Sequence, residues 1–397
     1  MPSAPFTARF LPRIADVEAT LWNALAGENY PFMRHEFLHA LEQSGCVGAR
    51  SGWRPQHLLI AREGSETPIA CMPLYLKTNS MGEYVFDWSW ADAYERHGHA
   101  YYPKLLTAIP FTPCAGPRIC VGAGASTQSI VPVVLAAIEQ LAEQRELSSW
   151  HLLFPEAELR NQLSDLGLMQ RSGCQYQWFN AGYRDFEHFL DSFSSRKRKN
   201  LRKERARVAE AGIAFDVLEG AAITDELWQQ FFRFYQSTYL VRGRAPYLNV
   251  EFFEQLGRTM PERLLLVLAR KDGEPIAGAL FFKGKDTLYG RYWGCTEEYQ
   301  FLHFETCYYQ GIDYCIQHGI ARFDSGAQGE HKIQRGFKPV PTWSAHWIRH
   351  PDFARAIAQF VQEEERHIEA YMAHASEFLP FRRDLQLPGT SPALDQE

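Results

Sequence analysis

The pattern of apolar and polar positions along the chain predicts a protein of mixed α and β elements. Apolar residues spaced three and four apart indicate helices, and short apolar runs bounded by polar turns indicate strands. In the first half the patterns predict helices at 17–25, 32–43 and 128–143, with strands at 57–62, 68–70, 118–121 and 150–154. In the second half they predict helices at 225–239, 250–256 and 304–317, with strands at 264–270, 275–277, 288–294 and 321–324. The two halves therefore present their elements in the same order.

The chain carries an internal repeat that is visible in the residues as well as in the element order. The stretch 31–41 aligns with 246–256 and keeps a Pro, an aromatic residue, a Glu, a Phe and a Leu at matching positions. Each copy ends with a short helix that stops at a glycine, Gly167 or Gly336, and with a last strand that contains Trp178 or Trp347. The first copy is longer by roughly 38 residues, most simply around 86–104.

The repeat predicts two α/β domains in tandem, at 1–183 and 213–350. Between them, the strongly basic segment 184–212 is expected to form a connecting helix. After the second copy, apolar residues at helical spacing between 352 and 378 predict a C-terminal helix, and 351–397 is expected to hold this helix and a tail.

The composition is that of a globular protein. With 397 residues, of which 46% are hydrophobic, the chain has enough apolar side chains for two packed cores. Its start lacks the basic and apolar regions of a signal peptide, and no run of about 18 apolar residues occurs, so we expect a soluble, cytoplasmic protein without a transmembrane segment. The cysteines are scattered without a C-x-x-C pair, which favours reduced thiols. A net charge of -6 argues against a protein that coats DNA.

One short motif indicates a different chemistry. His35-Glu36-Phe37-Leu38-His39 fits the H-E-x-x-H pattern, in which two histidines hold zinc and the Glu activates water. The repeat of this stretch contains no histidine, and no third ligand follows at a suitable spacing. On a helical wheel Phe37 faces inward, while His35 and His39 lie nearly opposite, toward water. We therefore expect an ordinary helix without a metal, and keep a zinc peptidase as the third hypothesis.

The order of elements, together with the stretch Lys332-Ile333-Gln334-Arg335-Gly336-Phe337, is similar to the GNAT acyltransferase fold. Two such units joined by a basic helix look like the Fem-type transferases, which add amino acids from aminoacyl-tRNA to peptidoglycan precursors. More closely, FDSGAQGEHK at 323–332 and RGFKP at 335–339 resemble the FemAB-like group of predicted N-acyltransferases, also described as peptidoglycan biosynthesis/recognition proteins. The resemblance covers roughly residues 15–350, and it implies two tandem GNAT-like domains and acyl transfer.

The donor-binding loop of the GNAT fold departs from its usual pattern in this chain. The fold binds the donor's pyrophosphate at a glycine-rich loop that opens the long helix, through backbone N–H groups and the helix dipole. In the second copy this place reads GCTEEYQFLH at 294–303, which is acidic and almost without glycine, whereas the first copy offers VGAGAS at 121–126. The resemblance leaves acyl-CoA and aminoacyl-tRNA open as donor substrates and implies no tightly bound cofactor.

Candidate chemistry gathers in the second copy. Acyl transfer to an amine needs a neutral nucleophile, a group that accepts its proton and donors for the oxyanion. The end of the strand at 321–324, the turn after it and the start of the 304–317 helix supply such groups. The catalytic candidates are Asp324, Glu330, His331, Glu305 and His303. The candidates for binding substrate are Gln328, Lys332, Arg335, Arg291, Tyr292 and Trp293, with Trp88 and Asp92 in the inserted segment.

Each of these groups also has a structural interpretation. The polar turn would be a solvated helix cap, Glu305 would only complement the helix dipole, and Trp88 would pack in a core.

The connecting segment is the most basic part of the chain, with eight cations within 196–207. Cations in a first helical turn oppose the helix dipole, so helix stability does not explain them. A phosphate-bearing partner would: a nucleotide, a lipid phosphate, CoA or tRNA. The candidates for binding phosphate are Arg196, Arg198, Lys199 and Arg202, with Arg244 in a later loop. The alternative is a solvated basic face.

The first hypothesis is therefore an N-acyltransferase or aminoacyltransferase that moves an acyl group from a thioester or aminoacyl-tRNA to an amine, which the resemblance suggests belongs to a cell-wall precursor. Direct attack in a shaped site requires no metal and no covalent intermediate. The second is a non-catalytic protein that binds peptidoglycan fragments or another phosphorylated ligand, favoured by the missing phosphate loop. The sequence leaves the donor, the acceptor and the oligomeric state open.

Overall fold

The computed structural model describes residues 6–327 and 329–382, and these fold into two compact α/β units. Of the described residues, unit 1 comprises 6–174, 247–259 and 341–370. Unit 2 comprises 175–246, 260–327, 329–340 and 371–382. Each unit thus draws on three separate stretches of chain, whereas the repeat had predicted domains that are continuous in sequence.

The strands of unit 1 form two groups. The first is antiparallel, in the order β1-β3-β4-β7, with bounds Phe6–Leu11, His57–Arg62, Pro68–Met72 and Cys120–Val121. The second has the order β15-β8-β6-β5-β2, with bounds Lys338–Ile348, Ser149–Leu153, Lys104–Thr107, Tyr75–Lys77 and Trp53–Pro55. Strands β6 and β8 run parallel, while β15 pairs with β8, and β5 with β6, in antiparallel register.

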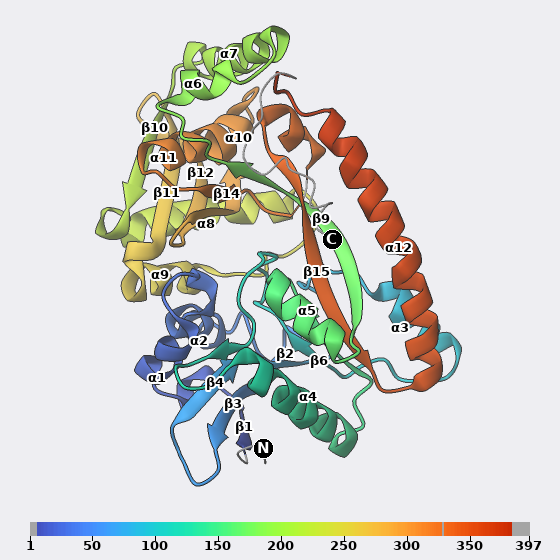
Figure 1. Cartoon of the computed structure of the whole chain (residues 1–397). Helices are drawn as coiled ribbons and strands as arrows, with labels where there is room; N and C mark the ends of the chain where they lie inside the picture. Colours follow the sequence, from blue (N-terminus) through green and yellow to red (C-terminus); the bar gives the residue numbers. More distant parts are fainter. Residues whose placement is uncertain (1–5, 328, 383–397) are drawn as a thin grey trace. The chain divides into compact units, whose positions relative to one another are not determined.

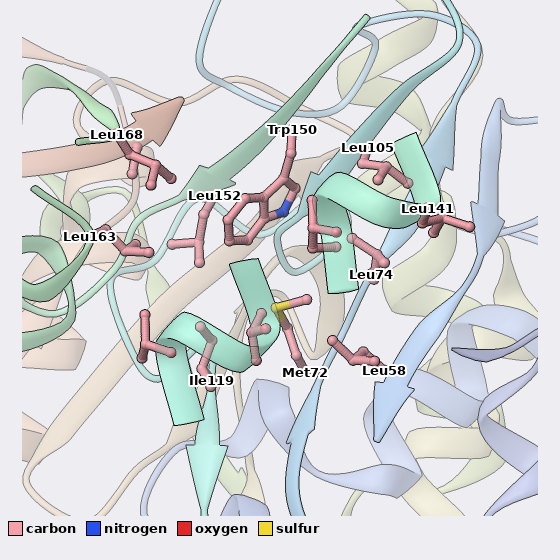
Figure 2. Close-up of a cluster of buried hydrophobic side chains, with 14 of the residues drawn as sticks. Leu58, Met72, Leu74, Leu105, Ile119, Leu141, Trp150, Leu152, Leu163 and Leu168 are labelled. Atoms are coloured by element: carbon pink, nitrogen blue, oxygen red, sulfur yellow. The ribbon is translucent and has the colours of Figure 1, made fainter. Parts of the chain in front are cut away.

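The helices of unit 1 are α1 (Ala19–Ala26), α2 (His35–Gln43), α3 (Trp88–Arg96), α4 (Thr127–Gln144), α5 (Ala157–Asp165), α9 (Val250–Thr259) and most of α12 (Pro351–Glu377). Its main apolar core lies between the strands and helices α4 and α5. Leu58, Met72, Leu105, Trp150 and Leu152 come from the strands, and Leu141 and Leu163 come from the helices (Figure 2). These side chains are nearly inaccessible to water, so this core supplies much of the hydrophobic stabilisation of the unit.

The two copies of the repeated helix pack against each other inside unit 1. Helix α2 comes from the first copy and α9 from the second, and the rings of Phe37 and Phe252 meet edge to face with centroids 5.7 Å apart. The Asn249 side chain, just before α9, donates a hydrogen bond to the Ser44 carbonyl at 2.8 Å. The equivalent helices of the two copies, α2 and α9, therefore form a packed pair inside unit 1.

Within unit 1, helix α12 runs beside the long strands β9 (Met169–Phe179) and β15 (Figure 1). Arg171 of β9 makes a two-pronged ion pair with Glu364 of α12, with N–O distances of 2.6 and 2.8 Å. Ile357 and Val361 of α12 join Trp90 and Tyr94 of α3 in a second apolar cluster. The predicted C-terminal helix is confirmed, and its apolar stripe covers this side of unit 1.

Unit 2 contains the sheet order β10-β11-β12-β13-β14-β9. The new strands are β10 (Ile213–Glu219), β11 (Leu264–Lys271), β12 (Glu274–Lys283), β13 (Thr287–Cys295) and β14 (Arg322–Asp324). Strands β10 to β13 are antiparallel neighbours, β13 and β14 are parallel, and β14 is antiparallel to the last residues of β9.

The two copies of the repeat have exchanged their last strands. In unit 2, β14 of the second copy pairs with residues 177–179 of β9, the last strand of the first copy. In unit 1, β8 of the first copy pairs with residues 344–348 of β15, the last strand of the second copy. This exchange explains why each unit is assembled from both halves of the sequence.

The helices of unit 2 are α6 (Phe186–Asp191), α7 (Ser195–Glu210), α8 (Asp225–Leu240), α10 (Leu302–Phe304) and α11 (Gln310–Gln317), with the end of α12. Helix α8 lies so close to β13 that a Cβ at Gly294 would sit 1.7 Å from the Phe234 carbonyl oxygen, which only glycine avoids. The predicted 304–317 helix is interrupted: a π-helical turn, Glu305–Tyr309, joins α10 to α11. Such turns frequently occur at functional sites.

Short 3-10 helices complete the described elements, at Ile14–Asp16, Pro31–Met33, Gly220–Ala222, Pro261–Arg263 and Glu330–Arg335. The last of these, η6, closes the polar turn after β14. No helix within residues 6–327 and 329–382 is both long and apolar enough to cross a bilayer.

Candidate functional site

The candidate site lies in unit 2, at the carboxyl end of β14, where its pairing with β13 stops. The two strands pair only from Thr287 to Tyr289 of β13, after which β14 ends at Asp324 while β13 continues to Cys295. Asp324 is buried, and its Oδ1 accepts a hydrogen bond from the Gly326 N–H at 2.9 Å. Its Oδ2 is also buried and has no hydrogen-bond partner among the described residues. Ligands of open α/β sheets commonly bind outside the carboxyl ends of the strands.

The turn after β14 is held together by Lys332. The buried Lys332 ammonium donates to the carbonyls of Ser325, at 3.0 Å, and Gly326, at 2.7 Å. Gly326 and Gly329 have φ angles of +91° and +115°, which favour glycine. A Cβ at Gly329 would also lie 2.3 Å from the His331 ring, so this glycine makes room for the imidazole.

Two imidazoles and a tyrosine gather beside this turn. His331 Nε2 and the Tyr308 hydroxyl are 2.9 Å apart, and the His303 ring lies 5.3 Å from the Tyr308 ring and 6.1 Å from the His331 ring. Trp293 of β13 meets the His303 ring edge to face at 5.3 Å. Within the described residues, the ring nitrogens of His303 have no hydrogen-bond partner, which leaves them available to a substrate.

Burial and nearby positive charges keep both histidines neutral at physiological pH. Burial, followed by the charges of His331, Lys332 and Arg335, lowers the pKa of His303 to about 4. Burial, followed by the charges of Arg335 and Lys332, lowers the pKa of His331 to about 4, although part of its ring is exposed. A neutral imidazole is able to accept a proton.

Arg335 fixes the end of η6. Its Nη1 donates to the His331 carbonyl at 2.7 Å, and its Nη2 lies 2.9 Å from both carboxylate oxygens of Glu204 on α7. Its guanidinium lies 3.4 Å above the centroid of the Phe304 ring. A buried guanidinium with a carboxylate and an aromatic ring around it has a fixed position.

Glu305 is buried and fully engaged by its neighbours. Arg205 of α7 donates to Glu305 from Nε and Nη2, at 3.1 and 2.8 Å, and also reaches Asp313 at 2.7 Å. The Gln310 amide donates to Glu305 at 2.8 Å. This ion-pair network stabilises the π-helical turn, so the geometry gives Glu305 a supporting position.

Strand β13 presents its candidates on two faces. Trp293 contacts the His303 ring, and Arg291, at the β-bulge where the register of β13 shifts, lies next to Gly326. Tyr292 points the opposite way and packs in the core, where its ring meets that of Tyr235 with centroids 5.6 Å apart. Arg291 and Trp293 thus belong to the candidate site, and Tyr292 supports it from behind.

The remaining second-copy candidates lie at the margin of the site. Glu330 is exposed and accepts a hydrogen bond from the Tyr371 hydroxyl at 2.8 Å. Arg244 is exposed in the loop after α8. Gln328 lies outside the described residues.

The inserted segment forms helix α3 in unit 1. Trp88 is 52% exposed and its ring packs on Phe86 with centroids 4.9 Å apart, and Asp92 is exposed as well. Their neighbours Asp87 and Trp90 are buried instead.

Unit 1 contains a second polar cluster, which we call the buried ionic layer: Lys77, Glu83, Asp87, Tyr101, Lys104, His151 and His346. Lys104 bonds Glu83 at 2.8 Å and also Asp87, and the Tyr101 hydroxyl bonds Asp87 at 2.5 Å. The chain of contacts continues from His151 Nδ1 to His346 Nδ1 at 2.6 Å. Burial lowers the pKa of His151 to about 3 and that of Lys77 to about 7.

The HEFLH stretch forms helix α2, but one expectation about it is wrong. His35 is buried, not turned toward water, and its Nε2 lies 3.0 and 3.2 Å from the carbonyl oxygens of Ile14 and Val17. The preceding 3-10 turn folds back over the helix and covers this side, which a wheel of the helix alone misses. Glu36 is held by Asn23 and Arg34. Among the described residues no group of three metal-binding side chains occurs.

The basic segment forms helix α7 at the margin of unit 2 (Figure 1). Several of its cations are already paired: Arg198 with Asp191 at 3.0 Å and Arg202 with Glu187 at 2.9 Å. Arg196, Lys199 and Lys203 are exposed and have no ion pair with any residue that the structure describes. The predicted connecting helix is therefore present, with part of its charge neutralised.

The candidate glycine-rich loop of the first copy leads into α4, whose N-terminus is capped by its own chain. Ser126 and Ser129 exchange hydrogen bonds in a capping box, with N–O distances of 3.3 Å. The Gly124 carbonyl accepts from Arg62 at 2.8 Å.

Sequence reasoning missed Tyr308, Glu204 and Arg205. Glu204 is the only acid within 196–207, and a lone acid among cations is a signal that it pairs inward. Tyr308 carried no signal, because an aromatic residue at helical spacing normally packs in a core.

Comparison with known proteins adds a family and a fold. The model of the FemAB-like family, described as peptidoglycan biosynthesis/recognition, matches residues 13–383. No curated protein matches the sequence.

Among solved structures, FemX is 13% identical, with 86% of this chain and 98% of that chain covered and a TM-score of 0.54. A conserved protein of unknown function from Bacteroides thetaiotaomicron is 11% identical, with 85% and 99% covered and a TM-score of 0.50. At such identities the likeness concerns the fold, and the predicted fold class, two tandem GNAT-like domains with a basic connecting helix and a C-terminal helix, is confirmed.

Proposed function

The chain belongs to the FemAB-like family, and from that premise we propose that it is an acyltransferase of the Fem type, which transfers an acyl or aminoacyl group from an ester or thioester to an amine of a peptidoglycan precursor. The observation that carries the proposal is the state of His303, which is neutral at physiological pH and has no hydrogen-bond partner among the described residues. It lies beside the turn that follows β14, together with Trp293 and the positive charge of Arg291.

In the proposed reaction the acceptor amine attacks the carbonyl carbon of the donor. The new C–N bond forms while the carbonyl oxygen becomes negatively charged, and His303 takes the proton that the amine nitrogen loses. The positive charges of Arg291, Lys332 and Arg335 stabilise the oxyanion. The C–O or C–S bond of the donor then breaks, and the leaving oxygen or sulfur receives the proton from His303.

Tyr308 and His331 lie beside His303 and assist the proton transfer. Burial raises the pKa of Tyr308, so its hydroxyl stays protonated and able to donate. With His331 Nε2 at 2.9 Å, the pair provides a second route for a proton beside the His303 ring.

The test is a transfer assay read by mass spectrometry. Purified protein is mixed with candidate precursor amines and with a panel of acyl-CoA and aminoacyl-tRNA donors, and the amine is examined for the added mass of the acyl group. The proposal expects a product with at least one donor, and loss of that product in a His303→Asn variant. Tight binding of a precursor without transfer from any donor would instead establish a non-catalytic binding protein.

That second function has an observation in its favour. The loop between β13 and α10 holds exposed Glu297 and Glu298, and Phe301 precedes α10 in a left-handed conformation without a side-chain cap. This arrangement disfavours a pyrophosphate at the start of α10, because the carboxylates repel it.

A further inference from the structure

The last part of the described chain lies against η6, the 3-10 helix that closes the turn after β14. The Tyr371 hydroxyl, near the end of α12, donates a hydrogen bond to Glu330 at 2.8 Å. The Gln334 amide donates to the Phe378 carbonyl, just after α12, at 3.2 Å. Because Glu330 opens η6 and Gln334 lies near its end, both ends of this helix are held. We call Tyr371 and residues 378–382 the C-terminal strap.

The strap is itself fixed to the segment between α6 and α7. Phe193 and Phe381 pair as an antiparallel bridge, and their ring centroids are 5.2 Å apart. Backbone hydrogen bonds of 2.9 Å flank this bridge on both sides. The buried Phe193 ring also reaches the end of η6, where a Cβ at Gly336 would lie 3.1 Å from it. This pairing gives the strap a defined position, unlike that of a loose chain end.

Helix η6 depends on support from outside its own backbone. It is a 3-10 helix of six residues, and such runs are uncommon beyond three or four residues because their hydrogen bonds are poorly aligned. It lies between Gly329 and Gly336, which both have positive φ, and no side chain caps its start. Glycines lose more conformational freedom than other residues when the chain becomes ordered. The buried Lys332 and Arg335 hold the inner side of the helix, and the strap holds its more exposed side.

The Tyr371 hydroxyl connects η6 to a buried partner. The hydroxyls of Tyr176 and Tyr371 are paired, and since Tyr371 gives its one proton to Glu330, Tyr176 donates to Tyr371. Tyr176 belongs to β9 and is only 4% exposed, so it gives the Tyr371 hydroxyl a fixed position. Burial, followed by the hydrogen bonds with Tyr176 and Glu330, raises the pKa of Tyr371. The donor to Glu330 therefore stays protonated at neutral pH.

The position of η6 decides where the His331 ring lies. His331 directly follows Glu330 and is exposed, so solvent does not restrict its side chain. Its Nε2 lies 2.9 Å from the Tyr308 hydroxyl. A backbone shift of about 1 Å would lengthen this contact beyond hydrogen-bond reach. The order of the turn is therefore a condition for the pairing of His331 with Tyr308.

We propose that the C-terminal strap positions His331 for acyl transfer, with Tyr371 as the positioning residue that fixes the start of η6 through Glu330. This inference rests on the proposed function, in which Tyr308 and His331 carry a proton beside the His303 ring. The Tyr371 hydroxyl is occupied by Tyr176 and Glu330, so it acts through the geometry of the turn and not by binding substrate.

The experiment compares Tyr371→Phe with a matched control, Tyr314→Phe, which also removes from unit 2 a hydroxyl that donates to a carboxylate, that of Glu219 at 3.0 Å. Hydrogen–deuterium exchange of the full chain, read by mass spectrometry, follows the peptide 329–337. Its exchange should rise about 3- to 10-fold in Tyr371→Phe, the effect of one lost hydrogen bond, and stay unchanged in the control. Glu330→Gln keeps an acceptor and should exchange like the natural chain, whereas Glu330→Ala should resemble Tyr371→Phe.

Transfer kinetics give the second measurement. With a donor and an amine that react in the transfer assay, Tyr371→Phe should lower kcat by about 2- to 5-fold and leave KM within about 2-fold, because the turn is misplaced while substrate binding is kept. A merely structural role would instead speed exchange throughout unit 2 and leave kcat per folded molecule unchanged.

Three outcomes overturn the proposal: unchanged exchange of 329–337 in Tyr371→Phe, faster exchange throughout unit 2, or faster exchange of 329–337 with an unchanged kcat. Exchange is measured without turnover, so it distinguishes this failure from that of the proposed function. If the natural chain transfers no acyl group, the proposed function fails and with it the role of the strap in catalysis, whereas exchange still shows whether the strap orders η6.

Discussion

The buried ionic layer of unit 1 and the candidate site of unit 2 contain the same kinds of residue in different situations. Both combine two histidines and a tyrosine with lysine and carboxylate side chains. In unit 1 the cationic and anionic groups compensate each other and both histidine side chains are buried. In unit 2 His303 and His331 are partly accessible, and the site lies at the carboxyl end of β14, where its pairing with β13 stops.

The difference shows that residue types alone do not make a site. A buried network in which cations and carboxylates compensate each other specifies a structure, because removing a charged member leaves its partner uncompensated. A network with accessible neutral imidazoles is able to exchange protons with a ligand. We therefore expect substitutions in unit 1 to change stability, and those in unit 2 to change the reaction.

The largest effect is expected for His303→Asn. Removing the proposed base should lower the transfer rate by about 100- to 10,000-fold, with the free energy of unfolding changed by less than about 1 kcal/mol. Rate and urea unfolding are measured on the same preparation, and the exposed His374→Asn serves as the control. An unchanged transfer rate would show that His303 does not act as the base that distinguishes the unit 2 site from the buried ionic layer.

The matching change in unit 1 is Lys104→Met. It leaves Glu83 and Asp87 buried without their main cation, so the free energy of unfolding should fall by about 3–5 kcal/mol. The exposed Lys285→Met, measured in the same urea titration, should stay within about 0.5 kcal/mol of the natural chain. Equal stabilities of the two variants would contradict a structural role for the buried ionic layer.

The two histidine pairs should contribute to the pH dependence of stability with the same sign. Unfolded histidine has a pKa near 6.5, whereas the pKa of His303 and of His331 is lowered to about 4. Between these values the unfolded chain binds protons that the folded chain does not bind, so the stability that these histidines contribute is complete above about pH 6.5 and is lost as the pH is lowered toward 4. Urea unfolding at several pH values should give a shallower slope for a His303→Asn/His331→Asn variant. The remaining slope reports the other shifted groups, among them His151 and His346, and Glu83, whose pKa burial raises to about 7 and which acts with the opposite sign. If the double variant has the same slope as the natural chain, His303 and His331 have ordinary pKa values and the expectation is wrong.

The smallest effects are expected for the tyrosines of the two clusters, Tyr308 and Tyr101. Tyr308→Phe removes the hydroxyl that bonds His331 and should slow transfer by about 2- to 10-fold, which corresponds to about 0.5–1.5 kcal/mol. Tyr101→Phe removes a buried hydroxyl from Asp87 and His151 and should instead lower the free energy of unfolding by about 1–3 kcal/mol. Transfer kinetics and the free energy of unfolding are measured for both variants. Slower transfer by Tyr101→Phe together with lower stability of Tyr308→Phe would contradict the roles given to the two clusters.

Much of the fold was predictable from the sequence because it depends on local spacing. The apolar period predicted α4 and α12 nearly to their ends, and the paired runs predicted the hairpin of β11 and β12. The glycine-spaced stretch after β14 indicated a candidate site, and Asp324, His331 and Lys332 do lie together there. The supporting contacts of Arg205 and Glu204 were not predictable, because they join residues 100 and 131 positions apart.

The sequence by itself determined that the chain repeats one α/β unit, that a basic helix joins the copies and that a polar glycine-rich turn follows β14. These features follow from periodicity and residue type, which act over a few residues. Only the tertiary structure decided that β9 and β15 are exchanged and that α2 packs on α9. Since each copy offers a strand and a helix of the same pattern, local preference does not distinguish a partner in its own copy from one in the other. Packing and chain connectivity therefore decide which partner each strand and helix has.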